Sequence, residues 1–128
     1  RGMAEARKTP QKDGMKMEMI KNIPHQEVLA LKELVQVQPG QVVSKTLAQN
    51  KHVSLTLFAF DQGEEIGTHD SEGDAFVTVL EGTGMFVIGG KEYVLHAGEC
   101  VVMPSRVPHS VHAVESFKMM LTVVFPVQ

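Results

Sequence analysis

From Val42 onward the chain is a series of short runs rich in β-branched and other apolar residues, separated by glycine, proline and polar clusters. This spacing is typical of the strands of an antiparallel all-β domain. The runs expected to form strands are residues 42–48, 52–60, 75–81, 84–89, 91–96, 99–103, 110–114 and 117–125. Such a set suits two packed sheets around one interior, so we predict an all-β jelly roll over residues 41–128.

The residues before this domain divide into two parts. Residues 1–14 are polar and basic, and no apolar core with a small-residue cleavage site follows them, so we expect a leader or tail rather than a secretory signal. Residues 15–40 are expected to form an N-terminal arm. Residues 26–35 of this arm fit a short helix, since their apolar residues keep rough helical spacing, and they fit an extended arm nearly as well.

Composition excludes several classes of partner. The chain of 128 residues has a formal net charge of −3 with acids and bases interspersed, so it lacks the basic surface that nucleic acid would require. No run approaches the ~18 consecutive apolar residues of a membrane-spanning helix. We therefore expect a cytoplasmic protein that binds neither nucleic acid nor a membrane. The single cysteine, Cys100, cannot form a disulfide within its own chain and is expected to act as a small hydrophobe in the run CVVM.

Two histidines each belong to a glycine-anchored pattern. In the first pattern a glycine is followed by five residues and then histidine, and a second glycine closes the pattern. In the second, a glycine is followed by five residues and proline, and histidine comes after four further residues. The anchoring residues are Gly63, His69 and Gly82 in the first pattern and Gly98, Pro104 and His109 in the second.

Both patterns resemble the two motifs of the cupin family, in the family's order and at its spacing. In the first motif Ser71 stands where the family has a second histidine, and Ala75 stands where it has a glutamate. In the second motif Arg106 replaces a glycine and Ala113 replaces an asparagine. The resemblance covers about residues 40 to 125 and implies a double-stranded β-helix, the cupin form of the jelly roll.

The resemblance also implies a site where the family holds a divalent metal with three imidazoles and a carboxylate. This chain offers only two imidazoles there, those of His69 and His109. Ser71 does not replace the third, because a serine hydroxyl is a poor metal ligand. Glu72 or Asp74 would complete a two-histidine, one-carboxylate site for Zn, Fe, Mn or Ni if the loop bulged. The alternative is a metal-free pair of histidines that lines a small polar pocket, hydrogen-bonded to Ser71, backbone and water.

Alternation along strands predicts which side chains face the interior. If His69 faces inward, Ser71 does too. The same parity places His109 inside together with Val111 and Ala113, and places Ser110 and His112 outside. In the run 52–60 the more apolar set is expected inside, namely Val53, Leu55, Leu57 and Ala59. The aromatic and methionine residues expected to belong to the hydrophobic core are Phe58, Phe60, Phe76, Phe86, Met85, Met103, Met119 and Met120.

The candidate pocket residues are His69, Ser71, Met103, Arg106 and His109. Met103 directly precedes the motif proline and would offer a flexible wall for a ligand, although core packing is the usual role of a methionine in a strand. Arg106 lies in the turn before His109, where its planar fork would suit an anionic ligand such as a carboxylate. A solvated loop arginine is the alternative.

Three functions fit these residues. The first is a module that binds a small polar or anionic molecule in the barrel through His69, Ser71 and His109, with a weakly held metal or none. The second is a metal-dependent enzyme, either a dioxygenase or a sugar isomerase or lyase, in which a nearby carboxylate joins the two histidines. The third is a dimeric interaction module. Met15, Met17 and Met19 alternate with charged residues as in a strand, so the arm would add to a neighbour's sheet, and the resemblance implies a homodimer of this kind.

Overall fold

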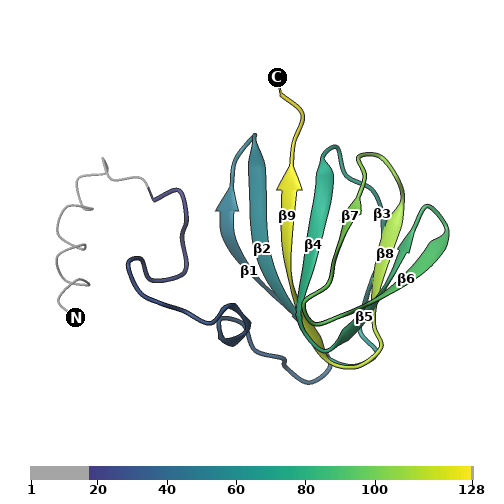
Figure 1. Ribbon diagram of the computed structural model, residues 1–128, viewed down its shortest axis with the longest axis horizontal. Coiled ribbons are helices and arrows are strands. Elements are labelled where there is room, and N and C mark those ends of the chain that lie inside the picture. Colours follow the sequence, from purple (N-terminus) through teal and green to yellow (C-terminus); the bar gives the residue numbers. More distant parts are fainter. Residues whose placement is uncertain (1–17, 128) are drawn as a thin grey trace.

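The computed structural model describes residues 18–127, which form two antiparallel sheets that face each other (Figure 1). Within these residues the strands are β1 (Val42–Gln49), β2 (Val53–Phe60), β3 (Glu65–His69), β4 (Asp74–Glu81), β5 (Thr83–Ile88), β6 (Lys91–His96), β7 (Cys100–Met103), β8 (His109–Ala113) and β9 (Phe117–Val124). One sheet has the order β1-β2-β9-β4-β7 and the other β3-β8-β5-β6. The all-β double-stranded β-helix expected from the sequence is confirmed.

Strand β3 is the element that the sequence pattern did not predict. Its run, EIGTH, has one strongly apolar residue, and most of the strand is exposed. Among the described residues it lies at the edge of its sheet and pairs with β8 alone, with a register shift between Ile66 and His69 that leaves Gly67 and Thr68 outside the ladder. Its strand conformation therefore depends on pairing with a distant segment rather than on local alternation.

The space between the sheets is filled by a core centred on three aromatic rings. Phe60, Phe86 and Phe117 are each 0% exposed. The rings of Phe60 and Phe117 stack with centroids 4.6 Å apart, and Phe86 meets Phe117 edge-on at 6.1 Å. Burial of one such side chain contributes about 1.5–3 kcal/mol, so this cluster is a main reason why the two sheets stay together.

A second core lies on the outer face of the five-stranded sheet, beneath the N-terminal arm. Its buried members are Val35, Leu47, Leu57 and Ala59, with partly buried Ile23, Leu31, Leu34, Val37, Val43, Leu55, Leu80 and Met120 around them. The prediction that the more apolar face of β2 points inward is therefore wrong. Phe58 and Phe60 face the barrel interior, whereas the Leu-rich face of β2 is covered by the arm. Both faces of this sheet are apolar, so hydrophobicity alone does not identify the inner one.

The arm is mainly irregular, and its only helical element among the described residues is one 3₁₀ turn, η1 (Leu31–Glu33). Residues 26–35 thus form neither the short α-helix nor an extended strand, but bends around this single turn. Backbone and side-chain bonds from Lys21 and Asn22 to β1 carbonyls tie the start of the arm to the edge of the sheet. Further along, the nearly buried Lys118 donates from Nζ to the carbonyl oxygen of Lys32 at 2.7 Å. The predicted leader, residues 1–14, and the residues Met15 and Met17 lie outside the described part of the chain.

Several other core predictions differ from the structure. Phe76 is 42% exposed, because its neighbours Ala75 and Val77 occupy the inward positions of β4. By the same alternation Met85 faces outward on β5, and Met120 belongs to the core beneath the arm. Met103, Met119, Phe60 and Phe86 lie in the barrel interior as expected, with Phe58 at its edge. Cys100 is exposed rather than packed. Among the described residues no helix is long and apolar enough to cross a membrane.

Candidate functional site

The two motif histidines meet at one end of the barrel. His69 is the last residue of β3 and His109 is the first residue of β8, and the two are partners in the strand register. Their ring centroids are 4.4 Å apart with planes inclined by 71°, so one ring meets the other edge-on. His69 is exposed and His109 is only 3% exposed. The structure therefore brings the two imidazoles together, one at the surface and one beneath it.

Each ring is oriented by a hydrogen bond to the backbone two residues earlier. Nδ1 of His69 lies 2.8 Å from the carbonyl oxygen of Gly67, and Nδ1 of His109 lies 3.1 Å from that of Val107. Since a carbonyl oxygen can only accept, each Nδ1 carries the proton, and in the neutral ring Nε2 keeps its lone pair. This is the arrangement that commonly orients metal-binding histidines.

The Nε2 atom of His109 has no hydrogen-bond partner among the described residues. Yet no buried side-chain nitrogen or oxygen among these residues lacks a partner. The Nε2 atom must therefore keep some exposure to solvent, although His109 as a whole is only 3% exposed. Within residues 18–127 neither imidazole has a hydrogen bond to Nε2, and the two rings lie at the same end of the barrel.

Electrostatics keep the inner ring neutral. Burial lowers the pKa of His109 below its ordinary value, and the adjacent His69 lowers this pKa further. The bond to Val107 and the carboxylate of Asp70 act in the opposite direction, with a smaller combined effect. Near neutral pH, His109 is therefore uncharged and its Nε2 is able to accept a hydrogen bond or to ligate a cation.

The lowered pKa of His109 also makes stability depend on pH in a defined direction. In the unfolded chain the residue takes up a proton as the pH falls through about 6.5, whereas in the folded chain it resists protonation until a lower pH. The contribution of His109 to the free energy of unfolding is thus fully present above pH ~6.5. It is lost as the pH falls toward the folded-state pKa. We expect this loss in urea unfolding of metal-free protein, and a shallower pH dependence in His109→Gln. Parallel profiles for the two proteins would show that His109 does not titrate in this way.

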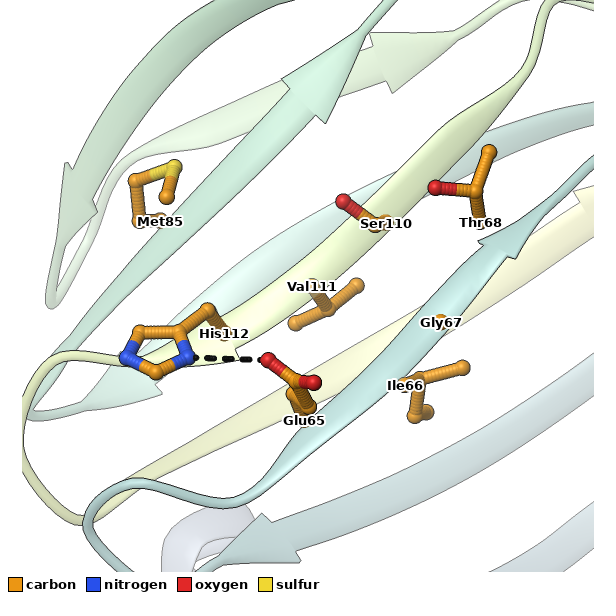
Figure 2. Close-up of a pocket in the computed structure, with 8 residues that line it drawn as sticks. All are labelled: Glu65, Ile66, Gly67, Thr68, Met85, Ser110, Val111 and His112. Carbon is orange, nitrogen blue, oxygen red and sulfur yellow. Dashed lines mark hydrogen bonds and ion pairs between the residues drawn. The ribbon is translucent and has the colours of Figure 1, made fainter.

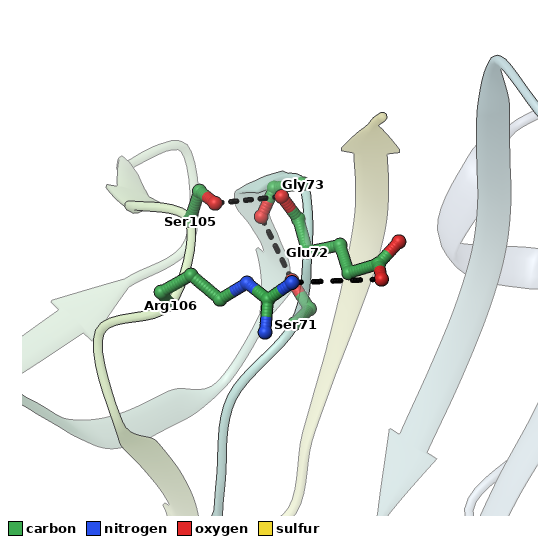
Figure 3. A network of polar contacts seen from close by, with 5 residues as sticks. All are labelled: Ser71, Glu72, Gly73, Ser105 and Arg106. Atoms are coloured by element: carbon green, nitrogen blue, oxygen red, sulfur yellow. Dashed lines mark hydrogen bonds and ion pairs between the residues drawn. The ribbon is translucent and has the colours of Figure 1, made fainter. Parts of the chain in front are cut away.

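Beside the histidines, the loop of residues 70–73 is fastened to the loop of residues 104–108, and we call these contacts the rim clasp (Figure 3). The backbone N–H of Arg106 donates to the carbonyl oxygen of Ser71 at 2.8 Å. The hydroxyl of Ser105 donates to the carbonyl oxygen of Glu72 at 2.6 Å. These bonds join the two motifs through their backbones and hold the ends of β3 and β8 in register.

The carboxylates near the histidines take part in the same clasp. Oδ1 of Asp74 accepts the backbone N–H of Ser105 at 2.8 Å. The Glu72 carboxylate lies 3.5 Å from the Arg106 guanidinium, and both side chains are mostly exposed. Within residues 18–127 no group of three or more His, Cys, Asp or Glu side chains is placed to hold a metal ion. The two imidazoles suit two positions of a metal, but a third protein ligand would require Glu72 or Asp74 to leave its present partner.

The other predicted pocket residues have mixed placements. The Ser71 hydroxyl is partly buried and donates to the carbonyl oxygen of Gly73 at 2.8 Å, so it stiffens the loop beside His69. Met103 is 2% exposed and pairs with Ala75 across β4 and β7, which favours core packing over a pocket wall. Arg106 has φ +65°, the left-handed conformation that explains the glycine at this motif position. Its guanidinium stays at the surface, beside Glu72.

Sequence reasoning missed the carbonyl groups of Gly67 and Val107, which orient the two rings. Their signal is local, because in each motif the acceptor lies two residues before the histidine, but only the backbone conformation shows that it turns toward the ring. Asp70 was also missed, although its carboxylate raises the pKa of His109 and so partly offsets the effect of burial.

A separate depression of about 370 Å³ lies over strands β3, β8 and β5 of the four-stranded sheet (Figure 2). His112 projects there, with Nδ1 3.3 Å from Oε1 of Glu65. Its lining residues are Glu65, Ile66, Gly67, Thr68, Met85, Ser110, Val111 and His112. His112 is thus on the opposite face of β8 from His109, as strand parity predicted.

Comparison with known proteins identifies relatives of the whole domain. The model of the cupin domain matches residues 56–125. A conserved protein of unknown function from Streptococcus pyogenes is 42% identical, with 88% of this chain and 98% of that chain covered and a TM-score of 0.85. A conserved barrel domain protein, cupin 2, from Leptotrichia buccalis is 39% identical over 73% of this chain and 45% of that one, with a TM-score of 0.71. A cupin superfamily protein from Desulfitobacterium hafniense is 26% identical over 84% of this chain and 98% of that one, with a TM-score of 0.80. No curated protein matches the sequence.

Proposed function

Since the chain belongs to the cupin domain family, we propose that it binds a small polar or anionic molecule at the end of the barrel where its two motif histidines meet. The observation that supports this proposal is the orientation of the imidazoles of His69 and His109. Both rings have Nδ1 bonded to backbone, so both have Nε2 available to a ligand. Edge-on contact at 4.4 Å places these rings close enough to act on one small molecule.

The surroundings suit a ligand that carries hydrogen-bond donors together with negative charge. Neutral imidazoles accept hydrogen bonds from hydroxyl or amino groups through Nε2. Arg106, held at the rim by the clasp, adds a positive charge that an anion would attract away from Glu72. A hydroxy acid or sugar acid combines these two features, and we propose that class as the ligand.

Binding should depend on His69 much more than on histidines elsewhere. Removal of one ligand contact commonly costs about 1–3 kcal/mol, so we expect His69→Ala to weaken binding roughly tenfold to hundredfold. The matched control is His112→Ala, which removes a partly exposed imidazole from the opposite face of β8. Calorimetric titration with a panel of hydroxy acids and sugar acids, with and without a chelator, measures the effect. Equal affinities for wild type and His69→Ala would contradict the proposed site.

A second candidate is a metal-dependent enzyme, a dioxygenase or a sugar isomerase or lyase. It is favoured by the Nδ1-to-carbonyl bonds, which would present two Nε2 atoms to Zn, Fe, Mn or Ni. Catalytic metal sites normally have three protein ligands, so this function needs a carboxylate from the rim clasp. Stoichiometric metal in the purified protein, lost in a His69→Ala, His109→Gln double variant, would favour this candidate over metal-free binding.

A further inference from the structure

The inner face of strands β1 and β2 carries hydroxyl groups that the histidine pair does not use. On β2, Leu55 and Leu57 lie beneath the arm. Ser54 and Thr56 alternate with them and therefore face the interior of the barrel. Thr46 of β1 is the direct partner of Thr56 across the two strands and shares its face. We call Thr46, Ser54 and Thr56 the hydroxyl wall.

The hydroxyl wall lies at the same end of the barrel as the motif histidines. At this end Val53 of β2 pairs with Val124 of β9, and Val124 pairs with Asp74 of β4. Asp74 is bonded to the rim clasp beside the histidines. Figure 1 shows β1 and β2 on one side of this end of the barrel and β3 and β8 on the other. The hydroxyl wall and the histidines therefore belong to facing sheets, and we call the region between them the mouth.

Thr56 is the member of the wall whose hydroxyl most needs a partner. The residue is only 9% exposed, and its hydroxyl makes no hydrogen bond to any group within residues 18–127. Because no buried side-chain oxygen among these residues lacks a partner, this hydroxyl must keep some exposure on the inner face of β2. Polar side chains buried to this extent are usually hydrogen-bonded. A ligand in the mouth would supply the missing bond.

The strands between the two sides of the mouth present apolar side chains. Val123 of β9 and Ala75 of β4 are partners in the strand register, and both are buried members of the interior core. Neither side chain can form a hydrogen bond to the hydroxyl wall or to the histidines. The polar groups of a ligand would therefore find partners at the two sides of the mouth, and its carbon skeleton would contact apolar residues between them.

We infer that the hydroxyl wall is the second side of the ligand site and that it selects a polyhydroxylated acid over a simple hydroxy acid. The histidines and Arg106 can bind a carboxylate and a neighbouring hydroxyl group. A simple hydroxy acid has no further polar group and would leave Thr56 without a partner. An acid with several hydroxyl groups can bond to both sides of the mouth at once. This inference rests on the proposed function, because the histidines bind the other end of the same ligand.

Thr56→Val tests the wall with little change in side-chain size. D-gluconate has a hydroxyl group on every carbon beyond its carboxylate, whereas L-lactate has a single hydroxyl group. In calorimetric titrations we expect the wild type to bind gluconate at least about tenfold more tightly than lactate, since several hydrogen bonds are added. Thr56→Val should weaken gluconate binding about threefold to tenfold, the effect of one lost hydrogen bond, and should leave lactate binding unchanged.

Three further variants show whether the hydroxyl group itself is responsible. Thr56→Ser keeps the hydroxyl and should bind gluconate as the wild type does. Thr46→Val removes the neighbouring hydroxyl and should also weaken gluconate binding, so it tests the wall even if Thr56→Val does not fold. Thr78→Val is the matched control, because Thr78 lies on the outer face of β4 in the same sheet and should not affect either acid. Far-ultraviolet circular dichroism confirms the fold of each variant.

The outcomes separate failure of this inference from failure of the proposed function. Gluconate binding that requires His69 but is unchanged in the folded wall variants would overturn the inference and leave the histidine site standing. Equal affinity of the wild type for the two acids, or equal weakening of both in Thr56→Val, would overturn it as well. If neither acid binds, or if binding is unaffected by His69→Ala, the proposed function fails and this inference fails with it.

Discussion

Replacement of Phe117 by alanine is expected to lower the free energy of unfolding by about 3–5 kcal/mol, the usual cost of a Phe→Ala change in a core. Phe117 is fully buried, stacks on Phe60 with centroids 4.6 Å apart and meets Phe86 edge-on. Loss of its ring would leave a cavity between the two sheets that the rigid strands cannot close. Urea unfolding followed by circular dichroism measures the change.

The matched control is Phe76→Ala, one strand away in the same sheet. Its ring is 42% exposed on the outer face, so in the monomer its loss should cost less than about 1.5 kcal/mol. Similar losses for the two variants would mean that the stacked rings do not form the centre of the core.

Gly82→Ala is expected to destabilise the fold by about 2–5 kcal/mol, because two separate penalties apply. The residue has φ +79°, and for a residue with a Cβ atom this conformation lowers the free energy of unfolding by about 1–2 kcal/mol. In addition, a Cβ atom here would clash with the carbonyl oxygen of Ser116 and press on Phe117. Relief of this clash would shift the loop before β9, and with it Phe117.

Gly90→Ala separates these two penalties. Gly90 has φ +83°, close to that of Gly82, but a Cβ atom there would have no neighbour within 4 Å. Its replacement should cost only the backbone strain of about 1–2 kcal/mol. If both alanine variants lose the same free energy in chemical denaturation, the glycine of the first motif is required for its conformation alone and not for close packing.

The sequence is informative where one face of a strand is polar. On β8, alternation correctly separates the buried His109, Val111 and Ala113 from Ser110 and His112. On β2 the same reasoning fails, because the arm makes the outer face as apolar as the inner one. The arm's contact with this sheet is made by irregular chain without periodicity, so no sequence pattern indicates which face it covers. Strand β3 was missed for a related reason, since its pairing with β8 is non-local and interrupted by a bulge.

The site shows the same division between local and long-range information. Motif spacing predicts that His69 and His109 meet, because the resemblance implies the family's fold, in which the motif histidines lie together. It does not predict that Glu72 and Asp74 are engaged with residues of the second motif more than 30 positions away. Those contacts depend on how two irregular loops pack. They are the reason why the carboxylates that the sequence offers as ligands hold the rim together instead.

The tautomeric state of the two motif histidines tests the central claim, that paired imidazoles present Nε2 to a ligand. Nitrogen-15 magnetic resonance of metal-free protein above pH 7 distinguishes a protonated Nδ1 from a protonated Nε2 in each ring. We expect both His69 and His109 to carry the proton on Nδ1, bonded to Gly67 and Val107, and both Nε2 signals to move together when ligand is added. A proton on Nε2 of either ring, or a ligand that leaves both signals unmoved, would contradict the proposed site.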